Sequence, residues 1–177
     1  LDHSGKALKT VELLQSLLAE NEKALIFTQY KEMGDLLKNL ITKELAFDAL
    51  FFHGGLTRKK RDEMIDQFQS DASPAPVMIV SLKAGGTGLN LTAASNVIHY
   101  DLWWNPAVED QATDRTYRIG QTKNVMVHRL ISIGTFEERI NEMIDAKREL
   151  AELTVAAGEA RITEMTNEQL KELFVLK

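Results

Sequence analysis

The hydrophobic positions of the chain alternate between two patterns, one typical of amphipathic helices and the other of buried strands. Apolar residues recur at helical spacing over residues 6–20, which predicts a helix with one buried face. The next run, KALIFT at residues 23–28, is short and shows no alternation, as expected for a strand that is buried on both faces. The chain therefore begins with a helix that is followed by a buried strand.

Further elements follow in the same order. Strands are predicted at residues 47–53, 77–81, 96–101 and 125–132. Helices are predicted through Met33, Leu36, Leu37 and Leu40, from a Thr57 cap to about Phe68, and over residues 107–118. Capping-box patterns predict two more helix starts, at Thr135–Glu138 and Thr166–Gln169. The weakly patterned residues 154–165 are expected to form a linker to the last helix.

Strands that alternate with helices up to about residue 150 predict an α/β fold, with a parallel sheet covered by helices on both faces. In such sheets, ligands bind at the carboxyl ends of the strands. The punctuated motifs of this chain all follow predicted strands: Thr28–Gln29, His53–Gly55, Ser81–Asn90 and Asp101–Asn105. This coincidence predicts a functional site at the carboxyl edge of the sheet.

Length and composition narrow the class of protein. With 177 residues and 44% hydrophobic content, the chain can bury a sizeable core as one domain with a small appendage. It has no apolar run long enough to span a membrane, no signal peptide and no cysteine, which fits a cytoplasmic protein. It begins without Met, so we expect a fragment of a longer protein. A net charge of −5 argues mildly against a nucleic-acid binder, so local basic patches must carry that case.

The glycine-rich segment SLKAGGTGLNL, residues 81–91, invites a phosphate-binding interpretation. It is not a Walker loop, because the chain contains no Gly-Lys-Ser/Thr, and Leu91 stands where G-x-G-x-x-G requires its last glycine. Backbone amides at Gly85, Gly86 and Gly88 could still bind phosphates of another kind. Four polar side chains accompany these glycines: Ser81, Lys83, Thr87 and Asn90. The alternative is a strained turn between a strand and a helix.

A second candidate is QATDRTYRIGQ, residues 111–121. Gln111, Arg115 and Arg118 are spaced i, i+4, i+7 and would share one helix face, which Gly120 would end. A guanidinium presents a fixed fork of donors that can stabilise charge on a transferring phosphoryl group. The alternative is a solvated face on which both arginines pair with nearby acidic residues. Those residues are Glu109, Asp110 and Asp114.

Two further segments carry weaker signals. Residues 58–61, RKKR, place four basic residues in a first helical turn, where the helix dipole disfavours them and a bound phosphate would offset the cost. An ordinary solvated face is the alternative. In DLWWNP, residues 101–106, Trp103 is expected to pack, whereas an exposed indole could lie against a sugar or base. His53, His99 and His128 lack metal-ligand spacing and are expected to be structural.

Together these segments resemble the second RecA-like lobe of superfamily-two helicases, specifically the Swi/Snf family of ATP-dependent DNA translocases. The resemblance covers most of residues 6–150, from KALIFTQY to VHRLISIGTFEERI, and its most specific part is the combination of AGGTGLNLTAA, WNP and RIGQ. The paired Trp103–Trp104 and the tail ITEMTNEQLKELF are similar to the prokaryotic branch.

The resemblance implies a RecA-like lobe at residues 1–153 and a linker with a bracing helix at 154–177. It implies that Arg115 and Arg118 are catalytic fingers on ATP, with Gln111, Gly86 and Gly88 near the nucleotide. It also implies contacts to double-stranded DNA from Thr28, Gln29, Arg58, Lys59, Arg61, Ser81, Lys83, Thr87, Asn90 and Trp104. No metal ligand is expected in the chain.

ATP and Mg²⁺ would be held mainly by the first lobe of the same protein, so the isolated fragment is expected to be inactive. A protein–DNA complex is the expected remodelling target, and a nucleoid-associated cytoplasmic location is implied. The alternatives are a lobe of a strand-separating DNA or RNA helicase, and a catalytically silent binding module that reuses the fold. A Rossmann-like small-molecule enzyme is disfavoured by the missing fingerprint.

Overall fold

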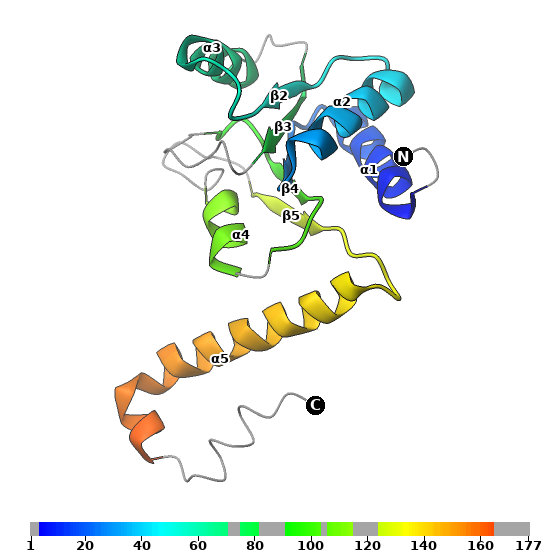
Figure 1. The fold of residues 1–177 in the computed structure, drawn as a ribbon. Helices are drawn as coiled ribbons and strands as arrows, with labels where there is room; N and C mark the ends of the chain where they lie inside the picture. Colours follow the sequence, from blue (N-terminus) through cyan, green and yellow to red (C-terminus); the bar gives the residue numbers. More distant parts are fainter. Residues whose placement is uncertain (1–3, 71–74, 82–90, 104–105, 115–123, 165–177) are drawn as a thin grey trace.

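A computed structural model describes residues 4–70, 75–81, 91–103, 106–114 and 124–164. Its centre is a five-stranded parallel sheet with the order β2-β3-β1-β4-β5 (Figure 1). The strands are β1 (Ala24–Thr28), β2 (Leu50–Phe52), β3 (Val77–Ser81), β4 (Asn96–His99) and β5 (Met126–Arg129). The predicted parallel α/β fold is therefore confirmed.

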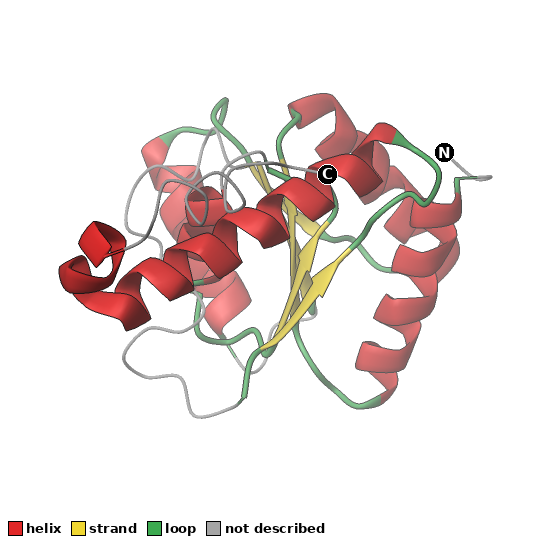
Figure 2. Ribbon diagram, turned by 90° about the horizontal axis from the view of Figure 1, so that it is seen from below, coloured by secondary structure: helices red, strands yellow, loops and turns green. Residues whose placement is uncertain are grey.

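The helices cover both faces of the sheet, as Figure 2 shows from a view turned by 90°. They are α1 (Gly5–Ala19), α2 (Lys31–Leu45), α3 (Arg58–Gln69), α4 (Pro106–Thr113) and α5 (Phe136–Glu164). Side chains of β1 alternate between the two resulting cores. Leu25 and Phe27 pack with Phe68 of α3 and Ala112 of α4, whereas Ile26 faces the side of α1 and α2. This two-sided burial is the reason that the strand showed no alternation of apolar and polar residues.

The helix caps follow the sequence. The Thr57 side chain accepts a hydrogen bond from the Lys60 N–H at the start of α3, as predicted. At the start of α5, the Glu138 carboxylate accepts from the Gly134 N–H at 2.9 Å, and the Thr135 hydroxyl accepts from the Glu137 N–H at 3.2 Å. The helix therefore begins where the capping-box pattern placed it, although each partner is shifted by one residue.

Several predicted boundaries differ from the structure. Strands β2, β4 and β5 are shorter than expected, because the apolar run begins before the paired residues of β2 and continues past the paired residues of β4 and β5. Helix α5 continues through Glu164, so residues 154–164 are helical and the expectation of a weakly patterned linker was wrong there. Alanine and glutamate, which are common in TVAAGEARITE, are strong helix formers and favour this continuation. The predicted helix at residues 166–169 lies outside the described residues.

None of the helices in the described ranges is long and apolar enough to cross a membrane.

Candidate functional site

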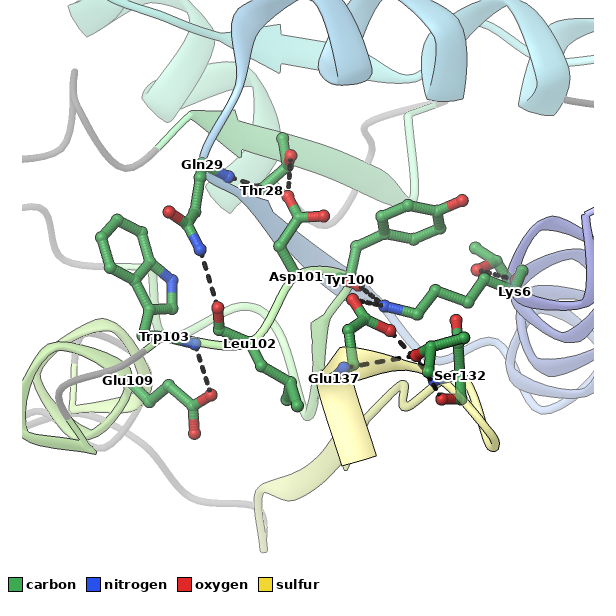
Figure 3. Close-up of polar contacts among 12 residues, drawn as sticks. Lys6, Thr28, Gln29, Tyr100, Asp101, Leu102, Trp103, Glu109, Ser132 and Glu137 are labelled. Carbon is green, nitrogen blue, oxygen red and sulfur yellow. Dashed lines mark hydrogen bonds and ion pairs between the residues drawn. The ribbon is translucent and has the colours of Figure 1, made fainter. Parts of the chain in front are cut away.

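Because all five strands are parallel, the carboxyl ends of β1, β3 and β4 lie at one edge of the sheet. There the Thr28 hydroxyl donates to Asp101 Oδ2 at 2.5 Å, and the Gln29 N–H donates to the same oxygen at 3.0 Å (Figure 3). The Gln29 side chain donates to the Leu102 carbonyl at 2.7 Å. The Asp101 carboxylate thus joins the ends of β1 and β4 and fixes the chain that leads toward α4.

Two of the residues that were predicted to contact DNA, Thr28 and Ser81, belong to this edge. Thr28 and Ser81 are neighbours in the β1–β3 register, and both are buried. The Thr28 hydroxyl is already engaged by Asp101. Both side chains are therefore buried beneath the surface at the carboxyl edge of the sheet. Their direct contact with DNA stays a prediction, and it would require these side chains to become exposed. Gln29 is half-buried and also has a structural partner.

Helix α4 follows this edge and carries the beginning of the arginine motif. Its residues Glu109 and Ala112 are buried, whereas Asp110 and Gln111 are exposed. Gln111 therefore lies on the solvent-facing side, where a contact with nucleotide is possible. The structure ends α4 at Thr113. Arg115 and Arg118 lie outside the described residues, so their shared helix face stays a prediction.

The buried Glu109 carboxylate is the centre of a group of residues, here called the α4 cluster, which consists of Glu109, Arg129, Arg148 and, through its backbone N–H, Trp103. Glu109 Oε1 accepts from the Trp103 N–H at 3.3 Å (Figure 3). Glu109 Oε2 lies 3.1 Å from Arg129 Nε and 3.5 Å from Arg148 Nη2. The Oε2–Nε pair is at ion-pair distance without the alignment of a hydrogen bond.

Both arginines of the α4 cluster have a second acidic partner. Arg129 Nη1 donates to Asp145 at 3.1 Å, and Arg148 Nη2 donates to Asp110 at 2.6 Å. Glu109 and Asp110 are thus occupied by cations from β5 and α5. Two of the three acidic residues that were the alternative partners of Arg115 and Arg118, Glu109 and Asp110, are therefore engaged by other cations, which weakens the interpretation of those arginines as a solvated, self-paired face.

The far end of α4 is held by a histidine. His99 Nε2 lies 3.0 Å from the Thr113 hydroxyl, and the His99 ring stacks on Phe27 with centroids 5.6 Å apart. Burial, followed by the positive charges of Arg129 and Arg148, lowers the pKa of His99 to about 4. The ring is therefore neutral near pH 7 and acts as a hydrogen-bonding wedge between β4 and α4.

The other two predicted structural histidines also have local partners. His53 Nδ1 accepts from the Gly55 N–H at 3.1 Å, and His128 Nε2 lies 3.3 Å from Asn96 Oδ1. Burial is the main cause that lowers the pKa of both rings. Within the ranges that the structure describes, no group of acidic or histidine side chains could hold a metal ion.

The basic first turn of α3 divides into two roles. Arg58, Lys59 and Lys60 are exposed, and no acidic residue lies in this turn. Arg61 instead donates to the Gly54 carbonyl at 2.7 Å and lies over the Phe52 ring, 5.7 Å from its centroid. Arg61 therefore braces the loop after β2. Among the exposed cations before it, Lys59 forms a solvent-exposed ion pair with Glu63 at 3.8 Å, a weak contact that leaves these cations accessible to a phosphate.

A second polar group, here called the α1 cluster (Lys6, Tyr100, Ser132 and Glu137), links α1 to the end of β4 and to the start of α5 (Figure 3). Lys6 Nζ donates to the Tyr100 carbonyl at 2.9 Å and to Glu137 Oε1 at 2.5 Å. Glu137 Oε2 accepts from the Ser132 N–H at 3.0 Å. Burial would raise the pKa of Glu137, but the hydrogen bonds from Lys6 and Ser132 outweigh it and hold that pKa below its usual value.

The remaining predicted site residues lie outside the described residues: Lys83, Gly86, Thr87, Gly88, Asn90 and Trp104. A surface hollow of about 690 Å³ lies beside the edge strand β2, between α2 and α3. No predicted site residue lines it. Sequence reasoning missed Arg129 and Arg148 as partners of Glu109. The available signal was an arginine inside the otherwise apolar run VMVHRLIS.

Comparison with known proteins places these features in context. Residues 7–120 match the family model of the helicase conserved C-terminal domain. A Bacillus subtilis protein, YwqA, with the provisional description ATP-dependent helicase/translocase, is 49% identical over 98% of this chain and 18% of its own length. The uncharacterized ATP-dependent helicase MG018 of Mycoplasma genitalium is 41% identical over 98% of this chain and 17% of its own length. The chain thus spans less than a fifth of these curated relatives.

Solved structures give the same result. The Sulfolobus solfataricus SWI2/SNF2 ATPase core in complex with dsDNA superposes with a TM-score of 0.71 at 44% identity, covering 98% of this chain and 36% of that one. The separate C-terminal domain of the SWI2/SNF2 ATPase from the same organism has a TM-score of 0.68 at 40% identity, covering 99% of this chain and 71% of that one.

Proposed function

Because this chain belongs to the helicase conserved C-terminal domain family, and within it to the Swi/Snf group, we propose that it is the second motor lobe of an ATP-dependent double-stranded DNA translocase. The names of its relatives support ATP-dependent helicase or translocase activity for the full-length protein. Most of the length of these relatives lies beyond the region that this chain matches, which agrees with a motor built from two lobes.

The proposal assigns ATP and Mg²⁺ to the partner lobe, since this chain contains no Gly-Lys-Ser/Thr loop of its own. When the lobes close, Arg115 and Arg118 reach the phosphates, while Gln111, Gly86 and Gly88 lie beside the nucleotide. An arginine supplied in this way stabilises the charge of the transferring phosphoryl group. In related reactions it contributes a factor of about 10³ to 10⁵ in rate.

The observation that carries this assignment is the occupation of the acidic residues on α4. Glu109 is paired with Arg129, and Asp110 is paired with Arg148 at 2.6 Å. With these carboxylates engaged, an anion from outside the lobe is the natural partner for the two arginines that follow α4. A nucleotide phosphate has the charge and geometry for a guanidinium fork.

Contact with DNA is assigned to the exposed cations Arg58 and Lys59 at the start of α3, and to Lys83, Thr87, Asn90 and Trp104. A DNA-bound relative of the same fold supports duplex DNA as the ligand. Contacts to phosphate do not read the base sequence, so the motor would track along DNA without strong sequence preference. Repeated closure of the lobes would then move one grip relative to the other.

The test uses the full-length protein and measures ATP hydrolysis with and without duplex DNA. Arg118→Ala should abolish DNA-stimulated turnover while ATP binding largely survives, whereas Arg139→Ala, an exposed arginine of α5, should leave turnover unchanged. Wild-type turnover in Arg118→Ala would refute the finger assignment. Equal stimulation by RNA would instead favour an RNA helicase, and no response to any nucleic acid would favour a silent binding module.

A further inference from the structure

Helix α4 has little apolar surface with which to hold its place. It contains eight residues, and among the side chains of residues 107–113, whose burial the structure describes, the one fully buried apolar group is the small Ala112. Polar contacts fix it instead, from Glu109 in its first half and from Thr113 at its last residue. The position of this helix therefore depends on a few directed contacts more than on packing.

Burying the Glu109 carboxylate in its pair with Arg129 costs free energy of desolvation. A buried carboxylate loses its hydration, and an apolar residue of similar volume at the same place is often at least as stabilising. Here the carboxylate is 1% exposed and its pair with Arg129 is not aligned as a hydrogen bond. A gain in stability is thus a weak explanation for a buried carboxylate at position 109. A fixed position for the helix is a sufficient explanation.

The contacts of the α4 cluster hold α4 from several directions. Arg129 lies between Glu109 and Asp145, and Arg148 lies between Glu109 and Asp110. Together with the bond from the Trp103 N–H, these contacts hold α4 against β5, α5 and the end of β4. A shift of α4 in any of these directions lengthens at least one charged contact.

We propose that Glu109 is a positioning residue, whose pairs with Arg129 and Arg148 set the place of α4 and of the Gln111 face that it presents to the nucleotide. This inference rests on the proposed function. Gln111 stands two residues after Glu109 on the exposed side of the helix, and the arginine motif continues directly from α4. Groups that meet a transferring phosphoryl must be placed within about 0.5 Å, and an error of about 1 Å can cost a factor of about 100 in rate.

The main variant is Glu109→Gln in the full-length protein. It removes the charge but keeps the shape and an acceptor for the Trp103 N–H. It also leaves Arg129 with Asp145 and Arg148 with Asp110, so the lobe is expected to fold. The matched control is Glu137→Gln, which removes a carboxylate of the α1 cluster that also pairs with a partly buried cation but does not touch α4.

We expect Glu109→Gln to lower the DNA-stimulated kcat by a factor of about 10 to 100, with KM for ATP changed by less than about 3-fold. Binding of a non-hydrolysable ATP analogue should keep its wild-type stoichiometry, which excludes loss of folded protein as the cause. Glu109→Asp, which keeps the charge, should recover part of the lost kcat. Glu137→Gln should retain wild-type kcat.

Two results separate the inference from the proposed function. If Arg118→Ala is inactive but Glu109→Gln binds the analogue and turns over like wild type, the positioning role is wrong and the motor assignment stands. If Arg118→Ala turns over like wild type, the motor assignment itself fails. Should Glu109→Gln not fold, Arg148→Gln replaces it, since that side chain lies at the edge of the cluster. A loss of kcat by about 3-fold or more is then expected, and a wild-type kcat would overturn the inference.

Discussion

The α1 cluster and the α4 cluster each join α5 to the rest of the lobe, but they are built differently. In the α1 cluster, the Lys6 ammonium and the Glu137 carboxylate make aligned bonds at 2.5 to 3.0 Å. In the α4 cluster, Glu109 is more deeply buried, and its contact with Arg129 lacks hydrogen-bond alignment. The arrangement of the α1 cluster is typical of contacts that stabilise the fold. The arrangement of the α4 cluster is typical of a site where the placement of a helix matters more than the stability gained.

The largest effect in this comparison of the two clusters is expected when Arg129 is removed from its pair with Glu109. Arg129→Met should lower the free energy of unfolding by about 3 kcal/mol, because Glu109 and Asp145 then lose a shared cation and the buried Glu109 keeps only the more distant cation Arg148 at 3.5 Å. Chemical denaturation of the purified chain measures this. Arg139→Met, an exposed arginine on the same helix as Asp145, should change it by less than about 0.5 kcal/mol. Equal effects of the two variants would contradict the contrast.

The acid side of the stability curve offers a second test, of similar size. Because the pKa of His99 is lowered from 6.5 to about 4, the unfolded chain takes up this proton before the folded one does. Stability should therefore fall by about 3 kcal/mol in all as the pH drops from about 6.5 to about 4. Denaturation at a series of pH values, compared with His99→Gln, isolates this contribution. An identical pH dependence in both proteins would show that His99 is not held neutral against α4.

The smallest effect is expected in the α1 cluster. Lys6→Met should lower the free energy of unfolding by about 1 to 2 kcal/mol, because Glu137 is partly exposed and keeps its bond from the Ser132 N–H. Lys9→Met, which breaks an exposed pair with Glu12, should cost less than about 0.5 kcal/mol. Thermal or chemical denaturation distinguishes them. A loss in Lys6→Met as large as that in Arg129→Met would remove the difference between the clusters.

The sequence was sufficient for the elements that depend on local pattern. Apolar runs identified all five described strands, and Thr57 and Gly134 marked two helix starts. The strand ends were overestimated because apolar residues such as Leu130 continue past the last pairing in the sheet. The linker was misjudged because helix propensity, which needs no amphipathic pattern, extends α5.

The contacts of the candidate site depend on topology and were therefore harder to predict. Thr28 and Asp101 are 73 positions apart and meet because β4 lies beside β1. Arg148 and Asp110 are 38 positions apart and meet because α5 passes α4. From the sequence, Glu109 was a possible surface partner for Arg115, and Thr28 was a possible ligand for DNA. The order of the strands and the course of α5 show that other residues already use these groups.

The same strand order has a consequence for folding while the chain is being synthesised on the ribosome. The first two strands, β1 and β2, do not pair with each other, and each has β3 as a neighbour. No backbone ladder between described strands can therefore form until Val77 has been synthesised, and β1 gains its other neighbour only with Asn96. Until then the apolar strand LIF can be covered only by helices, with Ile26 on the side of α1 and α2 and Leu25 and Phe27 on the side of α3. The nascent chain passes through a long interval in which its most buried segment has no strand to pair with.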